Sequence, residues 1–124
     1  MKWVRLTPQA EAAFGEIHEY SLRTWGAAAA EAYRQRIVNR LKALAAGKWP
    51  RGRSCAALFQ SAASAPAFAE LCYYREGSHY LIYRERADML MVVDMLHVSM
   101  DVERHLRALS GDDRDRSDEG EVGQ

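Results

Sequence analysis

The sequence predicts an α+β fold in which an antiparallel helical hairpin packs on a mainly antiparallel sheet. Residues 70–109 contain three apolar, aromatic-rich runs separated by short polar links, a pattern typical of a strand meander. Two long amphipathic segments precede them with almost no linker between. One face of the meander needs cover, and only these two segments can supply it.

The N-terminal part of the chain predicts a strand followed by a helix. Lys2–Leu6 alternates apolar and charged residues, as a short strand does. Thr7 is a good N-cap and Pro8 suits the first helical position, while Gly26 ends the helix. One face of this helix carries Ala10, Phe14, Ile17, Ser21 and Trp25.

A second helix is predicted over Ala27–Ala46, which has high helix propensity and no internal glycine or proline. Gly47 is a candidate for its C-terminal cap. Because about two residues join the helices, they must lie antiparallel. The apolar stripe of the second helix consists of Tyr33, Ile37, Leu41 and Leu44.

The connector Lys48–Pro66 is predicted to be a long loop, which Leu58 and Phe59 pin to the core. Glycine and proline punctuate it, and its middle is rich in alanine and serine. A loop of this length in a compact domain is often functional or mobile.

The strands of the meander are predicted at Leu71–Arg75, His79–Glu85 and Met89–Val98. The last is apolar on both faces except at Asp94, so we expect it to be central in the sheet and covered on both sides.

After the sheet, Met100–Leu109 predicts a short helix and residues 110–124 predict a disordered acidic tail. The tail holds six acids and two arginines, a net charge of −4, and the other 109 residues carry a net charge of +4. A mildly basic body favours an anionic partner. The charges also suggest a tail that folds back on the body, although a merely solubilising tail is the simpler interpretation. We expect one domain over residues 1–109.

Composition narrows the class of protein. The chain has neither a run long enough for a membrane helix nor the apolar segment of a signal peptide, so the expected location is the cytoplasm. Cys55 and Cys72 are expected to be thiols. The cysteines and histidines lack the spacing of a zinc site, and we expect no metal or cofactor.

Several stretches together resemble the RelE/ParE toxin superfamily of type II toxin–antitoxin systems, and within it the ParE branch most closely. The resemblance covers about residues 3–109, and its most specific parts are Gly77-Ser78-His79 before a Tyr/Ile strand and the segment from Leu96 to Leu106. The other matching stretches are Leu6–Glu11, Tyr20–Gly26, Ala32-Tyr33 and Tyr74–Arg84.

The resemblance implies a toxin that inhibits DNA gyrase by binding it. It also implies a cognate ParD-like antitoxin of the ribbon-helix-helix type, which neutralises the toxin by wrapping a segment around it. In such modules the complex contacts DNA only through the antitoxin or gyrase. The family's role in plasmid stabilisation comes with the same resemblance.

Two alternatives stay open. A RelE-like nuclease, which cleaves mRNA on the ribosome, would need a proton-transfer group and cations on the phosphate; Arg84, His97 and Arg75 are its candidates. No aromatic residue follows Tyr83, which disfavours this chemistry. The third possibility is an inactive toxin fold that still binds an antitoxin.

For a toxin that acts by binding, no catalytic residue is expected. The candidate contacts with target or antitoxin are Arg75, Arg84, Met100, Asp101, Arg104, His105 and Trp25.

Each candidate also has a structural interpretation. The arginines of the sheet could pair with Glu76 or Glu85, Asp101 could cap the last helix, and His97 is expected to be buried near Asp101. We expect the three tryptophans, Trp3, Trp25 and Trp49, in or beside the core. An exposed tryptophan in a groove between helices and sheet would instead be a binding hot spot.

Overall fold

The computed structural model describes residues 2–48, 51–58 and 70–106 of the 124-residue chain. The predictions above for Trp49, Phe59, Leu109 and the acidic tail concern residues outside these ranges. Within the described part, neither helix combines the length and the apolar character that crossing a bilayer requires.

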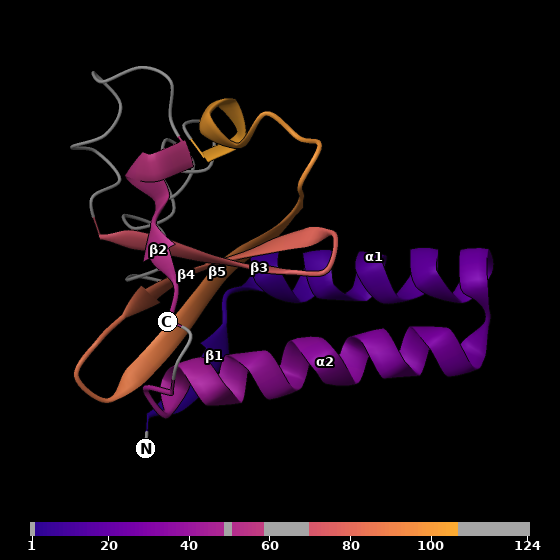
Figure 1. The fold of residues 1–124 in the computed structure, drawn as a ribbon, viewed down its shortest axis with the longest axis horizontal. Coiled ribbons are helices and arrows are strands. Elements are labelled where there is room, and N and C mark those ends of the chain that lie inside the picture. The colour runs from indigo at the N-terminus through magenta and orange to yellow at the C-terminus, as the bar shows by residue number, and fades with distance from the viewer. Residues whose placement is uncertain (1, 49–50, 59–69, 107–124) are drawn as a thin grey trace.

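The predicted N-terminal elements form as expected. Strand β1 (Trp3–Leu6) leads into helix α1 (Pro8–Trp25), whose first turn is capped by Thr7 Oγ1, which accepts a hydrogen bond from Ala10 N–H at 3.1 Å. Gly26, with φ of 92°, separates α1 from α2 (Ala27–Ala45). The two helices lie side by side and antiparallel (Figure 1).

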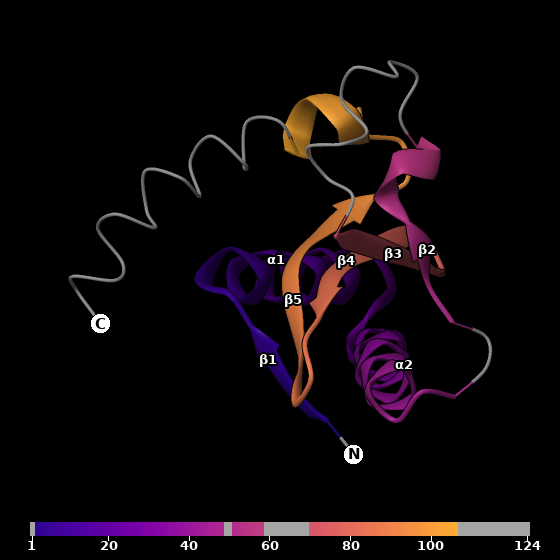
Figure 2. The same cartoon turned by 90° about the vertical axis from the view of Figure 1, so that its left-hand side faces the viewer.

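The meander is confirmed: β3 (Leu71–Glu76), β4 (His79–Glu85) and β5 (Met89–His97) pair antiparallel in sequence order. β1 adds to the other side of β5 in parallel, so β5 lies between two strands with most of its side chains buried on both faces. The sheet order is β1-β5-β4-β3-β2 (Figure 2).

The predicted loop contains two short elements that sequence reasoning did not find. β2 (Arg53–Ser54) pairs antiparallel with β3 at the sheet edge, and the 3-10 helix η1 (Cys55–Leu58) follows it. β2 has two residues, both exposed, and therefore leaves no hydrophobic pattern. Gly52 is required where this segment approaches β4, because a Cβ there would overlap the Tyr83 hydroxyl.

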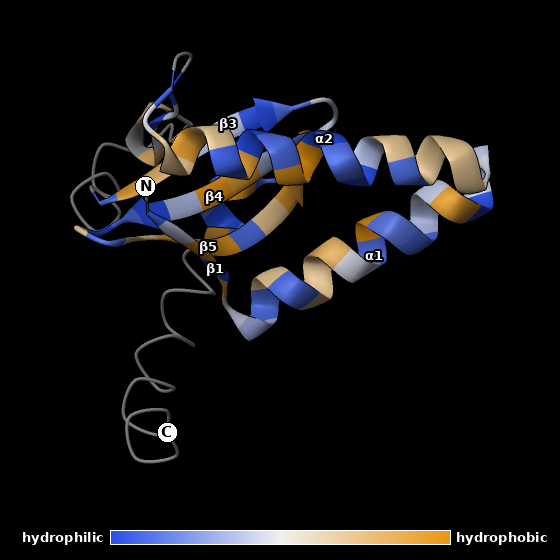
Figure 3. Ribbon diagram, turned by 90° about the horizontal axis from the view of Figure 1, so that it is seen from below, coloured by the Kyte–Doolittle hydropathy of each residue, from blue (hydrophilic) through white to orange (hydrophobic). Residues whose placement is uncertain are grey.

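The sheet has a buried cluster on each face. On one face α1 and α2 cover Leu81, Tyr83, Leu90 and Met95. On the other, Ile82, Val93 and Leu96 pack with Cys55 of η1 and with Val102 and Leu106. Hydrophobic residues accordingly run along β5, whereas hydrophilic residues interrupt both helices (Figure 3).

A charged cluster fastens the β3–β4 hairpin to α2. Glu76 is 9% exposed and accepts hydrogen bonds from Arg36 at 2.9 Å and from Arg40 at 3.0 Å. Arg40 also lies over the Tyr74 ring, 4.4 Å from its centroid. The hairpin end is therefore held at a fixed position beside the middle of α2.

The last described segment is helical over residues 102–106. Asp101 Oδ1 accepts a hydrogen bond from Arg104 N–H at 3.1 Å, so the predicted capping role of Asp101 is confirmed. His105 Nε2 lies 3.0 Å from Oδ2 of the buried Asp94 and ties this segment to β5.

Candidate docking groove

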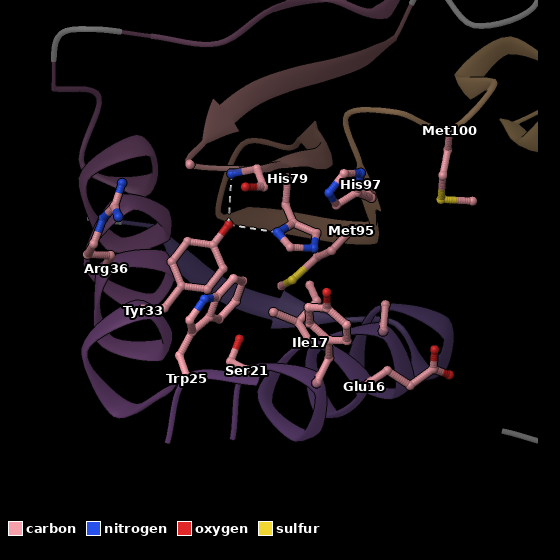
Figure 4. A pocket seen from close by; sticks show the side chains of 14 residues that line it. Glu16, Ile17, Ser21, Trp25, Tyr33, Arg36, His79, Met95, His97 and Met100 are labelled. Atoms are coloured by element: carbon pink, nitrogen blue, oxygen red, sulfur yellow. Dashed lines mark hydrogen bonds between the residues drawn. The ribbon is translucent and has the colours of Figure 1, made fainter. Parts of the chain in front are cut away.

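A groove of about 820 Å³ lies between the helical hairpin, in its half farther from the sheet, and one end of the sheet (Figure 4). This far half is the part in which α1 ends and α2 begins. Its helical wall comes from α1 and the first half of α2, and its sheet wall from the β3–β4 turn and the end of β5. Both walls are mainly apolar and aromatic. The residues that the argument uses are Tyr20, Trp25, Tyr33, His79, His97 and Met100.

Large apolar side chains are exposed at the groove. Trp25 is 62% exposed, and Tyr20 packs edge-to-face against it with ring centroids 5.7 Å apart. Met100, on the segment after β5, is 41% exposed. The expectation that Trp25 belongs to the core is wrong, because α1 runs past the sheet before its last turn (Figure 1).

Trp3 is also not a core residue. It points away from the helices on edge strand β1, where it is 76% exposed, while Val4 and Leu6 face the core. Trp3 lies outside the groove.

Tyr33 organises the polar floor of the groove. Its hydroxyl lies 2.9 Å from Glu76 O, 2.7 Å from His79 Nδ1 and 3.1 Å from Ser78 N. Gly77 makes this contact possible: its φ is 60°, and a Cβ there would lie 2.7 Å from Tyr33 Cε1. Burial raises the pKa of Tyr33, so its hydroxyl stays protonated at neutral pH.

His79 and His97 stand opposite each other on β4 and β5, with their rings perpendicular and 5.4 Å apart. Burial, with a smaller contribution from His97, lowers the pKa of His79 to about 4, so this imidazole is neutral at physiological pH. His97 was expected to be buried near Asp101. It is instead exposed, because β5 ends there, and its Nδ1 pairs with Ser99.

The structure separates the predicted cations from the groove. Arg75 and Arg84 lie on the sheet face opposite the helices, since their neighbours Tyr74 and Tyr83 pack against the helical cluster. Arg84 stands opposite Leu71, four residues from Arg75 along β3. The candidate nuclease set of Arg84, His97 and Arg75 is therefore divided between two faces.

The expected pairing of these arginines with Glu76 or Glu85 does not occur. Glu76 binds Arg36 and Arg40, and Glu85 binds Lys2 and Arg51. Arg75 Nε donates to Gly77 O at 3.0 Å, whereas Arg84 Nε is a buried atom without a hydrogen-bond partner among the described residues.

Of the three polar candidates after β5, Arg104 has an exposed side chain. Asp101 is exposed and caps the helical segment, as described above. His105 is half-buried against Asp94 and is a structural residue. Burial raises the pKa of the Asp94 carboxyl, while the contact with His105 opposes that rise.

Sequence reasoning left Tyr20, Tyr33 and His79 out of the candidate contacts. Tyr33 occupies an apolar stripe position of α2, and its ring does pack against the core cluster, so the hydrophobic period gives no sign of the contacts that its hydroxyl makes. The available signal was the match of Gly77-Ser78-His79 to the ParE branch, which marked the turn that Tyr33 holds.

Comparison with known proteins identifies the family. The model of the family described as "ParE toxin of type II toxin-antitoxin system, parDE" matches residues 4–102. A solved structure described as "Chromosomal ParDE TA system from P. aeruginosa" has the same fold, with a TM-score of 0.58 and 16% sequence identity. The alignment covers 80% of this chain and 98% of that one. No curated protein matches this chain.

The family match spans most of the described strands and helices, including both walls of the groove up to Met100. The fold comparison agrees with it, and the expected α+β architecture is confirmed. The chain belongs to the ParE toxin family of type II toxin–antitoxin systems.

Proposed function

We propose that this toxin acts by binding DNA gyrase and that a ParD-like, ribbon-helix-helix antitoxin neutralises it in the cytoplasm. The observation that carries the proposal is the groove, in which aromatic side chains stay exposed beside a rigid polar floor. Exposed aromatic residues in a preformed groove are typical of sites that bind a partner's apolar segment.

The antitoxin is the partner that suits the groove best. The volume of the groove falls in the range of binding pockets, roughly 300–1,000 Å³, which is enough for a few large side chains. A segment that folds on binding would lay apolar side chains on Tyr20, Trp25 and Met100. Arg104, Arg75 and Arg84 lie elsewhere and remain proposed contacts with gyrase.

The division of Arg84, His97 and Arg75 between two sheet faces disfavours the nuclease alternative. General acid–base cleavage of a phosphodiester needs a proton-transfer group and a cation around one phosphate. This set cannot meet around one phosphate without a rearrangement of the sheet.

The test is a DNA gyrase supercoiling and cleavage assay with purified toxin, with and without the antitoxin encoded beside its gene. We expect inhibition with trapped broken DNA, and relief by the antitoxin. A gyrase reaction unaffected by the toxin contradicts the proposed target. Cleavage of ribosome-bound mRNA would then support the nuclease, and a lack of both activities with tight antitoxin binding would support the inactive module.

A further inference from the structure

The hydrogen bonds at the groove floor fix how its two imidazoles can bind a partner. His79 and His97 both line the groove, and the contacts within the described part of the chain engage Nδ1 of each ring. The Nε2 atom of each ring is then the one that remains for a docked group. Which of these atoms carries a proton follows from the hydrogen bonds at Nδ1.

For His79, the proton lies on Nδ1. The Tyr33 hydroxyl has a single hydrogen, which it donates to the carbonyl Glu76 O, since a carbonyl can only accept. The hydroxyl oxygen therefore accepts from Ser78 N–H and from His79 Nδ1–H. This is the one arrangement that satisfies all three contacts, and it leaves the Nε2 lone pair of the neutral His79 as an acceptor.

For His97, the proton lies on Nε2. Ser99 N–H donates to His97 Nδ1 at 3.1 Å, and the Ser99 hydroxyl lies 2.7 Å from the same nitrogen. A nitrogen that accepts from a backbone N–H holds no proton of its own. His97 therefore presents Nε2–H, a donor.

The two rings thus offer opposite functions side by side, an acceptor on β4 and a donor on β5. We propose that His79 and His97 form an amide-binding pair, in which His79 Nε2 accepts from the N–H of an amide and His97 Nε2–H donates to its carbonyl oxygen. The occupant is a segment of the antitoxin that places an Asn or Gln side chain at the histidines and an aromatic side chain on Trp25.

The amide follows from what the pair excludes. A carboxylate has no hydrogen to donate to His79 Nε2, and its oxygen would be repelled by the lone pair of that nitrogen. An ammonium group has no lone pair that could accept the hydrogen of His97 Nε2–H. A hydroxyl could serve both rings only if both nitrogens converged on its one oxygen. An amide carries donor and acceptor on different atoms and so offers one atom to each of the two rings, whose centroids lie 5.4 Å apart.

The first experiment measures the tautomers in the isolated toxin by long-range ¹H–¹⁵N correlation at neutral pH. We expect a protonated Nδ1 and an unprotonated Nε2 in His79, and the reverse in His97. In Tyr33→Phe, His79 should no longer be held in one tautomer and should show a mixture of the two, while the tautomer of His97 should stay unchanged. Finding the same tautomer in both histidines of the wild type overturns the proposal.

Tyr80→Phe is the matched control. Tyr80 is next to His79 in sequence, but it packs against Tyr73 on the opposite face of the sheet, with ring centroids 5.3 Å apart. Neither tautomer should change in this variant. A change equal to that of Tyr33→Phe would show that the hydroxyl contact does not set the tautomer, and would overturn the proposal.

The second experiment uses two probes that differ only at the group in question, 3-(indol-3-yl)propanamide and 3-(indol-3-yl)propanoate, in which a carboxylate replaces the amide. The indole of either can pack against Trp25. We expect the amide to shift the Nε2 resonances of both histidines and to bind about tenfold or more tightly than the carboxylate, since the latter leaves a hydrogen bond unmade. Equal affinities, or no shift at Nε2, overturn the proposal.

The inference rests on the proposed function only for the identity of the occupant as the antitoxin. Both experiments examine the toxin alone, so they can fail while gyrase inhibition and antitoxin binding succeed. Conversely, a toxin that does not inhibit gyrase can still have the expected tautomer in each histidine and bind the amide more tightly than the carboxylate.

Discussion

The two halves of the helical hairpin have similar amphipathic sequences and different surroundings. In the half next to the sheet, Ala10 and Ile17 of α1 and Ile37 and Leu41 of α2 are buried against the strands. In the far half, the buried side chains are the small Ser21 and Ala30, whereas Tyr33 is half-buried and Trp25 is exposed.

This difference arises from the extent of the sheet. The helices continue past the strands, so that the end of α1 and the start of α2 lie beyond the sheet (Figure 1). The near half therefore supplies folding stability, whereas the far half leaves aromatic side chains exposed at the proposed docking groove. Substitutions in the two halves should separate stability from binding.

The largest expected effect on stability is in the near half. Ile37→Ala removes a side chain with no exposed surface from the cluster between α2 and the sheet. We expect a loss of about 2–5 kcal/mol in the free energy of unfolding, from lost burial and the cavity that remains. Urea unfolding followed by circular dichroism measures it. A loss below about 1 kcal/mol would show that this cluster is not the core.

A smaller effect is expected where the two halves meet, at the β3–β4 turn. Gly77→Ala forces an alanine to a φ of 60° and places its Cβ against Tyr33, so we expect a loss of roughly 1–3 kcal/mol. Gly15→Ala is the matched control. Gly15 lies within α1 with open space around it, and its replacement should stabilise the helix by about 0.5–1 kcal/mol. Similar unfolding curves for the two variants would refute the role of the turn.

The smallest expected effect is a loss of stability in acid. The pKa of His79 is about 4 in the folded protein, below the ordinary value near 6.5, so the unfolded chain takes up this proton first. Stability is therefore complete above pH 6.5 and decreases as the pH falls toward 4. Because the ring is partly exposed, we expect no more than about 2 kcal/mol.

Urea unfolding at a series of pH values tests this against His79→Gln, which has no titrating ring. The variant should lose less stability between pH 6.5 and 4 than the wild type. Parallel curves for the two proteins would contradict the assignment of the pH dependence to His79.

The fold was predictable because the segments with a regular hydrophobic period are long and because capping and turn residues mark their ends. Thr7-Pro8, Gly26 and Gly77 set the ends of elements where the structure has them. The parallel pairing of β1 with β5 was not stated in advance, because alternation along Val4 and Leu6 shows a strand but not its neighbour.

The site was harder to predict. Hydrophobic periodicity shows which face of a helix or strand is apolar, but it does not show how far along that face another part of the fold packs against it. Trp25 continues the stripe of Ile17 and Ser21, and His97 continues an apolar strand, yet each is the last residue of its element and is exposed. The opposite error concerns His105, which was a candidate surface contact and instead lies against the buried Asp94. A β-bulge near Val92 turns Asp94 toward it.

The most direct test of the groove is a calorimetric titration of the antitoxin encoded beside the gene into wild type, Trp25→Ala and Trp3→Ala. Both tryptophans are exposed, but only Trp25 lies in the groove. We predict a loss of about 2 kcal/mol or more in binding free energy for Trp25→Ala, and less than about 0.5 kcal/mol for Trp3→Ala. Unchanged affinity in Trp25→Ala, or an equal loss in both variants, would contradict the assignment of the groove as the docking site.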